Sequence, residues 1–302
     1  MASRSKSLWC SLLAFVLVAF SAFSTAQDFS KVQIQTIKVA DGVYMLVGSG
    51  GNIGVSAGED GILMIDTQFA EIIEKIKSAI AEISSGQIRF VLNTNWHYDH
   101  AYGNEPLGKS GALIIAHENT RMRMTSEQNY PDFDMKMPAL PEAALPVLTF
   151  TDSLTLHFNG EEIQVTHIEK AHSDADIVIY FRKANVIHTG DLYFTVLYPY
   201  IDVSHGGSID GMIAAAERIS SMIDENTKII PGHGPLSNLE ELKTYRDMLV
   251  TIRDRIKKQI KEGKTLEEVL ASKPTADFDK EKSSAIPPEM FVQIIYNDLA
   301  KK

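Results

Sequence analysis

Four short polar segments, each set after an apolar run typical of a buried strand, constrain this chain most. Residues 93–100, written NTNWHYDH, follow the apolar run 88–92, and residues 171–176, 188–191 and 231–235 occupy similar positions. The ends of strands in one sheet converge on a common edge, so side chains in these segments can meet at one site. Imidazole and carboxylate groups both suit Zn²⁺. The segments therefore predict a metal site whose ligands come from the histidines and carboxylates that they contain.

The first 26 residues have the pattern of a secretory signal peptide. Arg4 and Lys6 precede an apolar run at residues 8–23, and Ser24-Thr25-Ala26 matches a small-x-small cleavage site. A membrane anchor is the alternative, but it needs a longer apolar span. We therefore expect a mature protein of residues 27–302 that is periplasmic or secreted, with no membrane association after cleavage.

Cysteine content and charge narrow the possible ligands and partners. The one cysteine, Cys10, lies in the expected leader, so the mature chain offers no thiolate to a metal and forms no disulfide. The chain has 39 acidic and 29 basic residues, a formal net charge of −10 at pH 7. Nucleic acids attract positive charge, so we expect a small-molecule substrate and no nucleic-acid partner. The sequence indicates no particular oligomeric state.

The order of apolar patterns indicates a sandwich of two sheets. Strands are predicted at residues 32–39, 43–47, 53–57 and 61–65, then a helix at 70–83, strands at 88–92 and 112–116, and a helix at 118–124. A second strand group is predicted from about residue 147, at residues 154–158, 163–167, 177–181 and 185–188, followed by a helix at 209–223, a strand at 228–230 and helices at 238–262 and 290–299. Residues 129–146 are predicted to form a surface loop.

Two similar halves of this kind predict an α/β protein with four layers, an αββα sandwich, in which two sheets pack together under outer helices. No linker separates the halves. We expect a single domain over residues 27–302 with a C-terminal helical extension.

The motifs resemble those of the metallo-β-lactamase superfamily. That family shows His-x-His-x-Asp-His, a distant His, an Asp in a Gly-Asp pair, and a last Gly-His. This chain has Asn95-x-His97-x-Asp99-His100, then His172, Gly190-Asp191 and Gly232-His233. The resemblance covers residues 34–242 and implies the αββα fold.

By this resemblance the chain binds one or two zinc ions. The first ion would take His97, His172 and a bridging Asp191, and the second would take Asp99, His100, His233 and the same Asp191. Asn95 stands where the family has a histidine, as a weak neutral ligand or as one that reaches the metal through water. One lactamase subclass also has Asn there, but it carries Cys at the position of Asp191.

The chemistry implied is hydrolysis by a metal-bound hydroxide, because a bound metal lowers the pKa of water from 15.7 to about 7. Asp99 is the candidate catalytic residue, since it could hold a metal and pass a proton. The substrate class expected is a cyclic amide, a cyclic ester or a thioester. A true β-lactamase is one alternative, and a non-catalytic metal- or ligand-binding protein is another.

Other residues have structural explanations at this stage. Asp66 and Asp176 are expected to orient neighbouring loops. Five further histidines are expected to be hydrogen-bonded or exposed and not ligands, namely His117, His157, His167, His188 and His205. The aromatic residues between 193 and 200 could pack on a substrate or belong to the hydrophobic core, and the sequence favours neither. The backbone amides of residues 206–208, which precede a predicted helix, could bind an anionic group.

Overall fold

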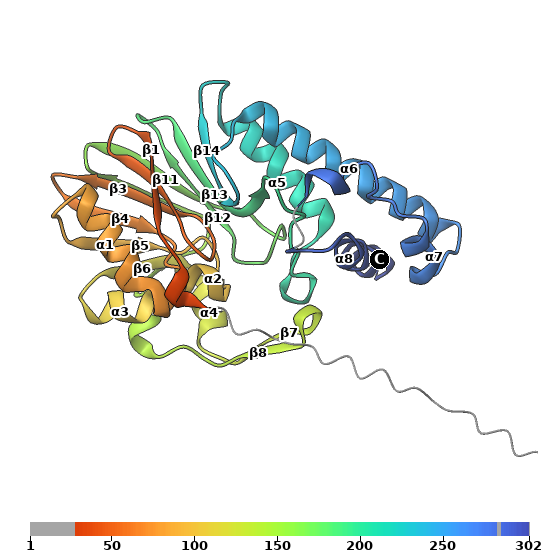
Figure 1. Ribbon diagram of the computed structural model, residues 1–302, viewed down its shortest axis with the longest axis horizontal. Coiled ribbons are helices and arrows are strands. Elements are labelled where there is room, and N and C mark those ends of the chain that lie inside the picture. Colours follow the sequence, from red (N-terminus) through yellow and green to blue (C-terminus); the bar gives the residue numbers. More distant parts are fainter. Residues whose placement is uncertain (1–27, 283–284, 302) are drawn as a thin grey trace, which may run out of the picture.

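The computed structural model describes residues 28–282 and 285–301 (Figure 1). The predicted signal peptide lies outside the described residues. Within the described ranges, no helix combines the length and apolar character needed to cross a bilayer.

Two sheets form the centre of the molecule. The first has seven strands in the order β1-β2-β3-β4-β5-β6-β9, and the second has five in the order β10-β11-β12-β13-β14. The strands of the first sheet are β1 (Gln35–Ala40), β2 (Val43–Val47), β3 (Ile53–Gly58), β4 (Gly61–Ile65), β5 (Ile88–Leu92), β6 (Leu113–His117) and β9 (Leu148–Phe150). Those of the second are β10 (Ser153–Phe158), β11 (Glu161–His167), β12 (Ile177–Phe181), β13 (Val186–Phe194) and β14 (Lys228–His233).

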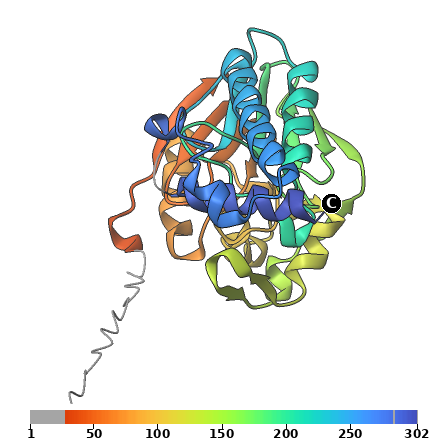
Figure 2. The same ribbon diagram turned by 90° about the vertical axis from the view of Figure 1, so that its right-hand side faces the viewer.

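Helices cover the outer faces of both sheets. The helices are α1 (Ile73–Ile83), α2 (Tyr98–Ala101), α3 (Asn104–Lys109), α4 (Glu118–Met124), α5 (Ile209–Met222), α6 (Leu239–Lys261), α7 (Leu266–Ala271) and α8 (Pro288–Ala300). Figure 1 shows α1 and α3 on one side of the paired sheets and α5, α6 and α8 on the other, the side that faces the viewer in Figure 2. The predicted four-layer αββα sandwich is confirmed.

Three apolar clusters occupy the three spaces between these layers. One lies between the sheets and joins residues such as Met45 and Leu63 to Ile163 and Ile179. A second lies between the first sheet and α1, whose buried residues Ile73, Ile76 and Ile80 recur at helical spacing. The third packs the second sheet against α5, α6 and α8. Burial of both faces explains why β4 and β12 read as continuous apolar runs rather than as alternating patterns.

The turn between β10 and β11 contacts the first sheet through hydrogen bonds. Asn159 and Gly160 both have positive φ values, 52° and 72°, as the two central residues of a tight hairpin require. The Asn159 side chain accepts from the Asp60 backbone amide at 3.0 Å, and the Asn159 backbone amide donates to the Asp60 carboxylate at 2.7 Å. The β10–β11 turn is therefore bound to the β3–β4 turn of the other sheet.

Two predictions about the middle of the chain are wrong. Residues 129–146 are not a plain surface loop, because they contain most of a short hairpin of β7 (Gln128–Tyr130) and β8 (Met135–Met137). The strand predicted near residue 147 does not open the second sheet. It is β9, which pairs in parallel with β6 and closes the first sheet, and Val147 already donates to the Ile114 carbonyl at 2.8 Å. Helix α7 and the short helices α2 and α3 were not predicted.

The buried cluster between the sheets should contribute more to stability than the exposed edge of the first sheet. Leu63 is fully buried in this cluster, whereas Leu148 on the edge strand β9 is 51% exposed. Leu63→Ala is expected to lower the free energy of unfolding by about 2–5 kcal/mol through lost burial and the cavity left behind. Leu148→Ala, the matched control, should cost less than about 1 kcal/mol. Urea unfolding measures both, and equal losses would contradict this account of the core.

Candidate metal centre

The structure brings the six predicted His and Asp ligands together in two groups. His97, His172 and Asp191 form one group, and Asp99, His100 and His233 form the other, with the ligand atoms of each group within 4.8 Å of one another. Asp191 lies between the groups. Its Oδ2 is 3.0 Å from Nε2 of His100 and 3.5 Å from Nε2 of His172, and its Oδ1 is 3.4 Å from Nε2 of His233.

The ligands reach this place from four parts of the fold. His97 immediately precedes α2, which follows β5, and His100 lies in its first turn. His172 lies in the connection from β11 to β12, and His233 ends β14. Asp191 lies inside β13 and not after a strand end as expected, at a place where the pairing with β14 is irregular.

Glycines allow the backbone to approach the ligands. A Cβ on Gly232 would lie 2.3 Å from Oδ1 of Asp191, and a Cβ on Gly51 would lie 2.2 Å from Cε1 of His100. Gly190 has a φ of +51°, which a side chain rarely tolerates, and a Cβ there would meet the Thr94 side chain at 2.6 Å. Any larger residue at these positions would displace a ligand or a neighbour of one.

Three buried carboxylates orient the histidines. Asp66 accepts from Nδ1 of His100 at 2.7 Å, and Asp176 accepts from Nδ1 of His172 at 2.9 Å, so the orienting roles predicted for these residues are confirmed. Asp202 accepts from Nε2 of His97 at 3.0 Å. Each contact fixes the tautomer of its imidazole and leaves the other ring nitrogen for a metal.

Asp66 holds its position with a strained backbone. Its φ is +62°, which is unusual for a residue other than glycine and often marks a functional site. Its carboxylate also accepts from the Thr94 amide at 2.7 Å and from the Thr94 hydroxyl at 2.6 Å. The strand end of β4 is thus bound to the segment that carries His97 and His100.

The sequence did not single out Asp202. It is fully buried, and besides His97 it binds the imidazole of His205 at 2.8 Å. Burial opposes its charge, but hydrogen bonds from His205 and His97 hold the pKa of the Asp202 carboxyl far below its usual range. His205 is hydrogen-bonded, as expected, and its partner, Asp202, also binds the candidate ligand His97.

Unsatisfied polar atoms lie in both groups of residues that could hold a metal. Nε2 of His100, Nε2 of His172 and Oδ1 of Asp191 are buried without a hydrogen-bond partner. The imidazole nitrogens and the carboxylate oxygens of Asp191 lie 3.0–3.5 Å from one another. Buried polar atoms without partners are costly, and a divalent ion in each group would satisfy them.

The electrostatics of the metal-free site also favour a cation. Burial opposes charge throughout, yet Asp176 and Asp191 raise the pKa of His172 to about 8, and Asp191 and Asp99 raise that of His100 well above its usual value. The same imidazoles, with His233, hold the pKa of Asp191 far below its usual range. Without a metal, protons on the imidazoles offset the charge of these carboxylates, and a metal would replace those protons.

Asn95 lies beside the site with its amide oxygen already used. The oxygen accepts from the His97 backbone amide at 2.8 Å, and the amide nitrogen faces Oδ2 of Asp191 at 3.3 Å. In this geometry Asn95 donates toward the carboxylate shared by the two groups. Ligation by its amide oxygen, which the sequence suggested, stays a prediction.

The two groups differ in their access to solvent. His97, His172 and Asp191 are at most 4% exposed, while the side chains of Asp99 and His233 are 19% and 20% exposed. Trp96, Tyr130 and Tyr200 pack around His97 with ring centroids 4.6–5.9 Å away. A substrate would therefore reach the site from the side of Asp99 and His233.

Two other segments that the sequence left open have structural roles. Tyr193 and Tyr198 belong to the hydrophobic core, and the Ser208 side chain caps the N-terminus of α5.

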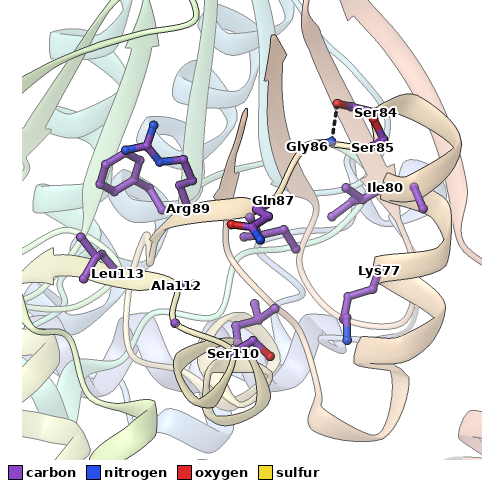
Figure 3. Close-up of a pocket in the computed structure, with 15 residues that line it drawn as sticks. Lys77, Ile80, Ser84, Ser85, Gly86, Gln87, Arg89, Ser110, Ala112 and Leu113 are labelled. Atoms are coloured by element: carbon purple, nitrogen blue, oxygen red, sulfur yellow. Dashed lines mark hydrogen bonds between the residues drawn. The ribbon is translucent and has the colours of Figure 1, made fainter. Parts of the chain in front are cut away.

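A cavity of about 550 Å³ lies elsewhere, on the outer face of the first sheet (Figure 3). Residues of α1, the first residues of β5 and the start of β6 line it, among them Lys77, Ile80, Arg89 and Leu113. The metal ligands follow the opposite end of β5. The cavity is therefore separate from the candidate chemistry.

Asp202 should support metal binding although it touches no metal. Asp202→Asn keeps the size of the side chain but presents an amide N–H to one of its two imidazole partners. Loss of such an orienting carboxylate typically weakens metal affinity about 10–100-fold. Zinc dissociation constants measured by chelator competition would test this, with Asp224→Asn, a change at a surface carboxylate, as the control. Equal affinity in both variants would show that Asp202 has no such role.

Comparisons with known proteins agree with this arrangement. Residues 46–234 match the family model described as the Metallo-beta-lactamase superfamily. A hydroxyacylglutathione hydrolase from Pelagibacter ubique (strain HTCC1062) is 26% identical over 147 residues, which are 48% of this chain and 52% of that protein. The chain therefore spans about half the length of this curated relative.

Solved structures show the same fold at low identity. A metallo-beta-lactamase from Pontibacter korlensis superimposes with a TM-score of 0.60 at 17% identity, over 72% of this chain and 99% of that one. The sec-alkylsulfatase Pisa1 from Pseudomonas sp. gives a TM-score of 0.63 at 16% identity, over 87% of this chain and 50% of that one. Because the family model covers more than half of the chain and the fold agrees, the protein belongs to the metallo-β-lactamase superfamily.

Proposed function

We propose that the protein is an exported, zinc-dependent hydrolase that cleaves a thioester or opens a cyclic ester or amide. The observation that carries this proposal is the pair of His/Asp groups joined by Asp191, with buried atoms that lack partners. Members of this superfamily are generally hydrolases. The export part rests on the leader-like residues 1–26.

The protein's own residues would hold the metal and handle the proton. His97, His172 and Asp191 would hold one ion, and Asp99, His100, His233 and Asp191 the other. Bound zinc supplies Lewis acidity and lowers the pKa of a water molecule to about 7. Burial opposes the charge of Asp99, but His100 and His233 lower its pKa to about 2, so it is ionised at neutral pH. An ionised, accessible Asp99 can orient a water molecule and accept its proton transiently.

The nature of residue 191 and the curated relative favour a thioester or ester. Asp191 stands where the lactamase subclass that also carries Asn has a cysteine, and the similar hydroxyacylglutathione hydrolase is, by its name, a thioester hydrolase. A β-lactamase remains the alternative on the strength of the shared fold. A non-catalytic binding protein is the second alternative.

A substrate panel with a ligand variant tests the proposal. The panel should hold thioesters, lactones, β-lactams and a secondary alkyl sulfate, assayed with zinc-reconstituted protein. At least one should be hydrolysed, with activity lost on chelation. His100→Ala should lower kcat/KM at least about a hundredfold, because it removes a ligand and not only its support. His157→Ala, at an exposed histidine on β10, is the control.

Two results would contradict the proposal in different ways. If the protein binds no zinc after reconstitution, the metal site is wrong and the non-catalytic alternative is favoured. If zinc binds but His100→Ala retains full activity, the metal site is not the catalytic centre.

The first metal position should be the weaker one, because Asn95 replaces a histidine. Asn95→His should raise zinc stoichiometry or affinity by adding an imidazole next to Asp191. Asn95→Ala removes the same hydrogen bonds without adding a ligand, and it should not raise either. Metal analysis and chelator competition on both variants decide this. Identical zinc binding by the two variants would show that position 95 cannot reach the metal.

A further inference from the structure

Two histidines stack where the sheets meet, outside the ligand set. His117 ends β6 of the first sheet, and His167 ends β11 of the second. Their ring centroids are 3.7 Å apart, and the rings are inclined by 11°. His117 is only 4% exposed. Two imidazoles at this distance cannot both carry a proton without strong repulsion.

The hydrogen bonds of His117 require its neutral form. Its Nε2–H donates to the Thr151 carbonyl at 2.8 Å. Its Nδ1 accepts from the Asn119 backbone amide at 3.2 Å, which makes His117 the N-cap of α4. A proton on Nδ1 would point an N–H group at the backbone N–H of Asn119, and this repulsion would remove the cap from α4.

Helix α4 in turn holds the loop that carries His172. The side-chain amide of Asn119 donates to the Asp174 carbonyl at 2.7 Å. Arg123 binds the Asp174 carboxylate at 2.6 Å. Asp174 lies between the ligand His172 and its orienting Asp176, so the position of α4 fixes the backbone of this loop.

We propose that His117 is a positioning residue for the metal centre that acts only in its neutral form, so that its protonation releases α4 and loosens the His172 loop. This inference rests on the proposed metal site. It predicts that metal affinity is lost on acidification by more than the titration of the ligands alone would cause.

The charges around His117 set the direction of this effect. Burial lowers the pKa of His117, and the stacked His167 lowers it further, while the Thr151 carbonyl and the carboxylates of Glu118 and Asp174 act in the opposite direction. On α4, Arg121 donates to the Pro146 carbonyl and Arg123 is paired with Asp174. The pKa of His117 is lowered in the structure in which His117 caps α4. The stability that this cap provides is therefore complete above pH 6.5 and is lost as the pH falls below that value.

His117→Asn is the informative variant, since asparagine caps helices well but does not titrate. Zinc affinity would be measured by chelator competition at pH 7.5 and pH 5.0 on the full chain. Wild type and His117→Asn should agree at pH 7.5. At pH 5.0 wild type should bind zinc about fivefold more weakly than His117→Asn, the factor typical of one lost N-cap. His117→Ala should be weaker than wild type at pH 7.5, which separates the cap from its titration.

Hydrogen exchange gives a readout that does not depend on metal. At pH 5.0, amides 118–124 and 171–176 should exchange faster in wild type than in His117→Asn, after correction for intrinsic rates, and equally at pH 7.5. His157→Asn is the control and should behave as wild type. If His117→Asn does not fold, His117→Ser provides the same cap.

The outcomes separate this inference from the proposed function. A wild-type to His117→Asn ratio that does not change with pH, in both affinity and exchange, would overturn the role of His117. Absence of zinc binding in every form would refute the metal site, while the exchange data would still decide whether His117 controls the loop.

Discussion

The structure depends on one buried carboxylate, Asp191, held among three imidazoles. The carboxylate is 4% exposed, and Nε2 atoms of His100, His172 and His233 lie 3.0–3.5 Å from it. A buried carboxylate is tolerated only when cations or donors surround it. The loops that carry the imidazoles come from both sheets, so the packing of the sheets and the placement of this charge depend on each other.

More negative charge is buried around Asp191 than the described side chains can offset without protons. Asp66, Asp176 and Asp202 are each at most 1% exposed, and Asp99 adds a partly exposed carboxylate. Their partners are mainly histidines, which are neutral unless protonated. A divalent ion in each group would supply the missing charge and leave the histidines neutral. The αββα scaffold provides the rigidity that such a site needs, since its ligands are fixed by strands and by backbone contacts at glycines.

The sequence predicted the layers, and the loops that hold most of the candidate ligands, for a physical reason. Apolar runs mark buried strands, and polar residues directly after such runs lie at sheet edges. Asp191 does not follow this rule, because it lies inside β13, and the choice of ligands within the loops rested on the resemblance to a known family. Asp202 could not be found in this way, because its partner His97 is 105 residues distant and no local spacing links them. The pairing of β9 was missed for a similar cause. A three-residue strand carries too little pattern to show which sheet edge it joins.

The position of Asn95 explains how the two groups can be chemically unequal within one site. Its amide oxygen is fixed by the His97 backbone, so its nitrogen must face Asp191. An N–H donor beside a carboxylate draws charge from its oxygen, and this oxygen, Oδ2, faces both His100 and His172. The group containing His97 is closed to solvent as well, whereas Asp99 and His233 are accessible. The histidine missing at position 95 favours tighter metal binding at the Asp99 group, and the difference in access favours substrate contact there.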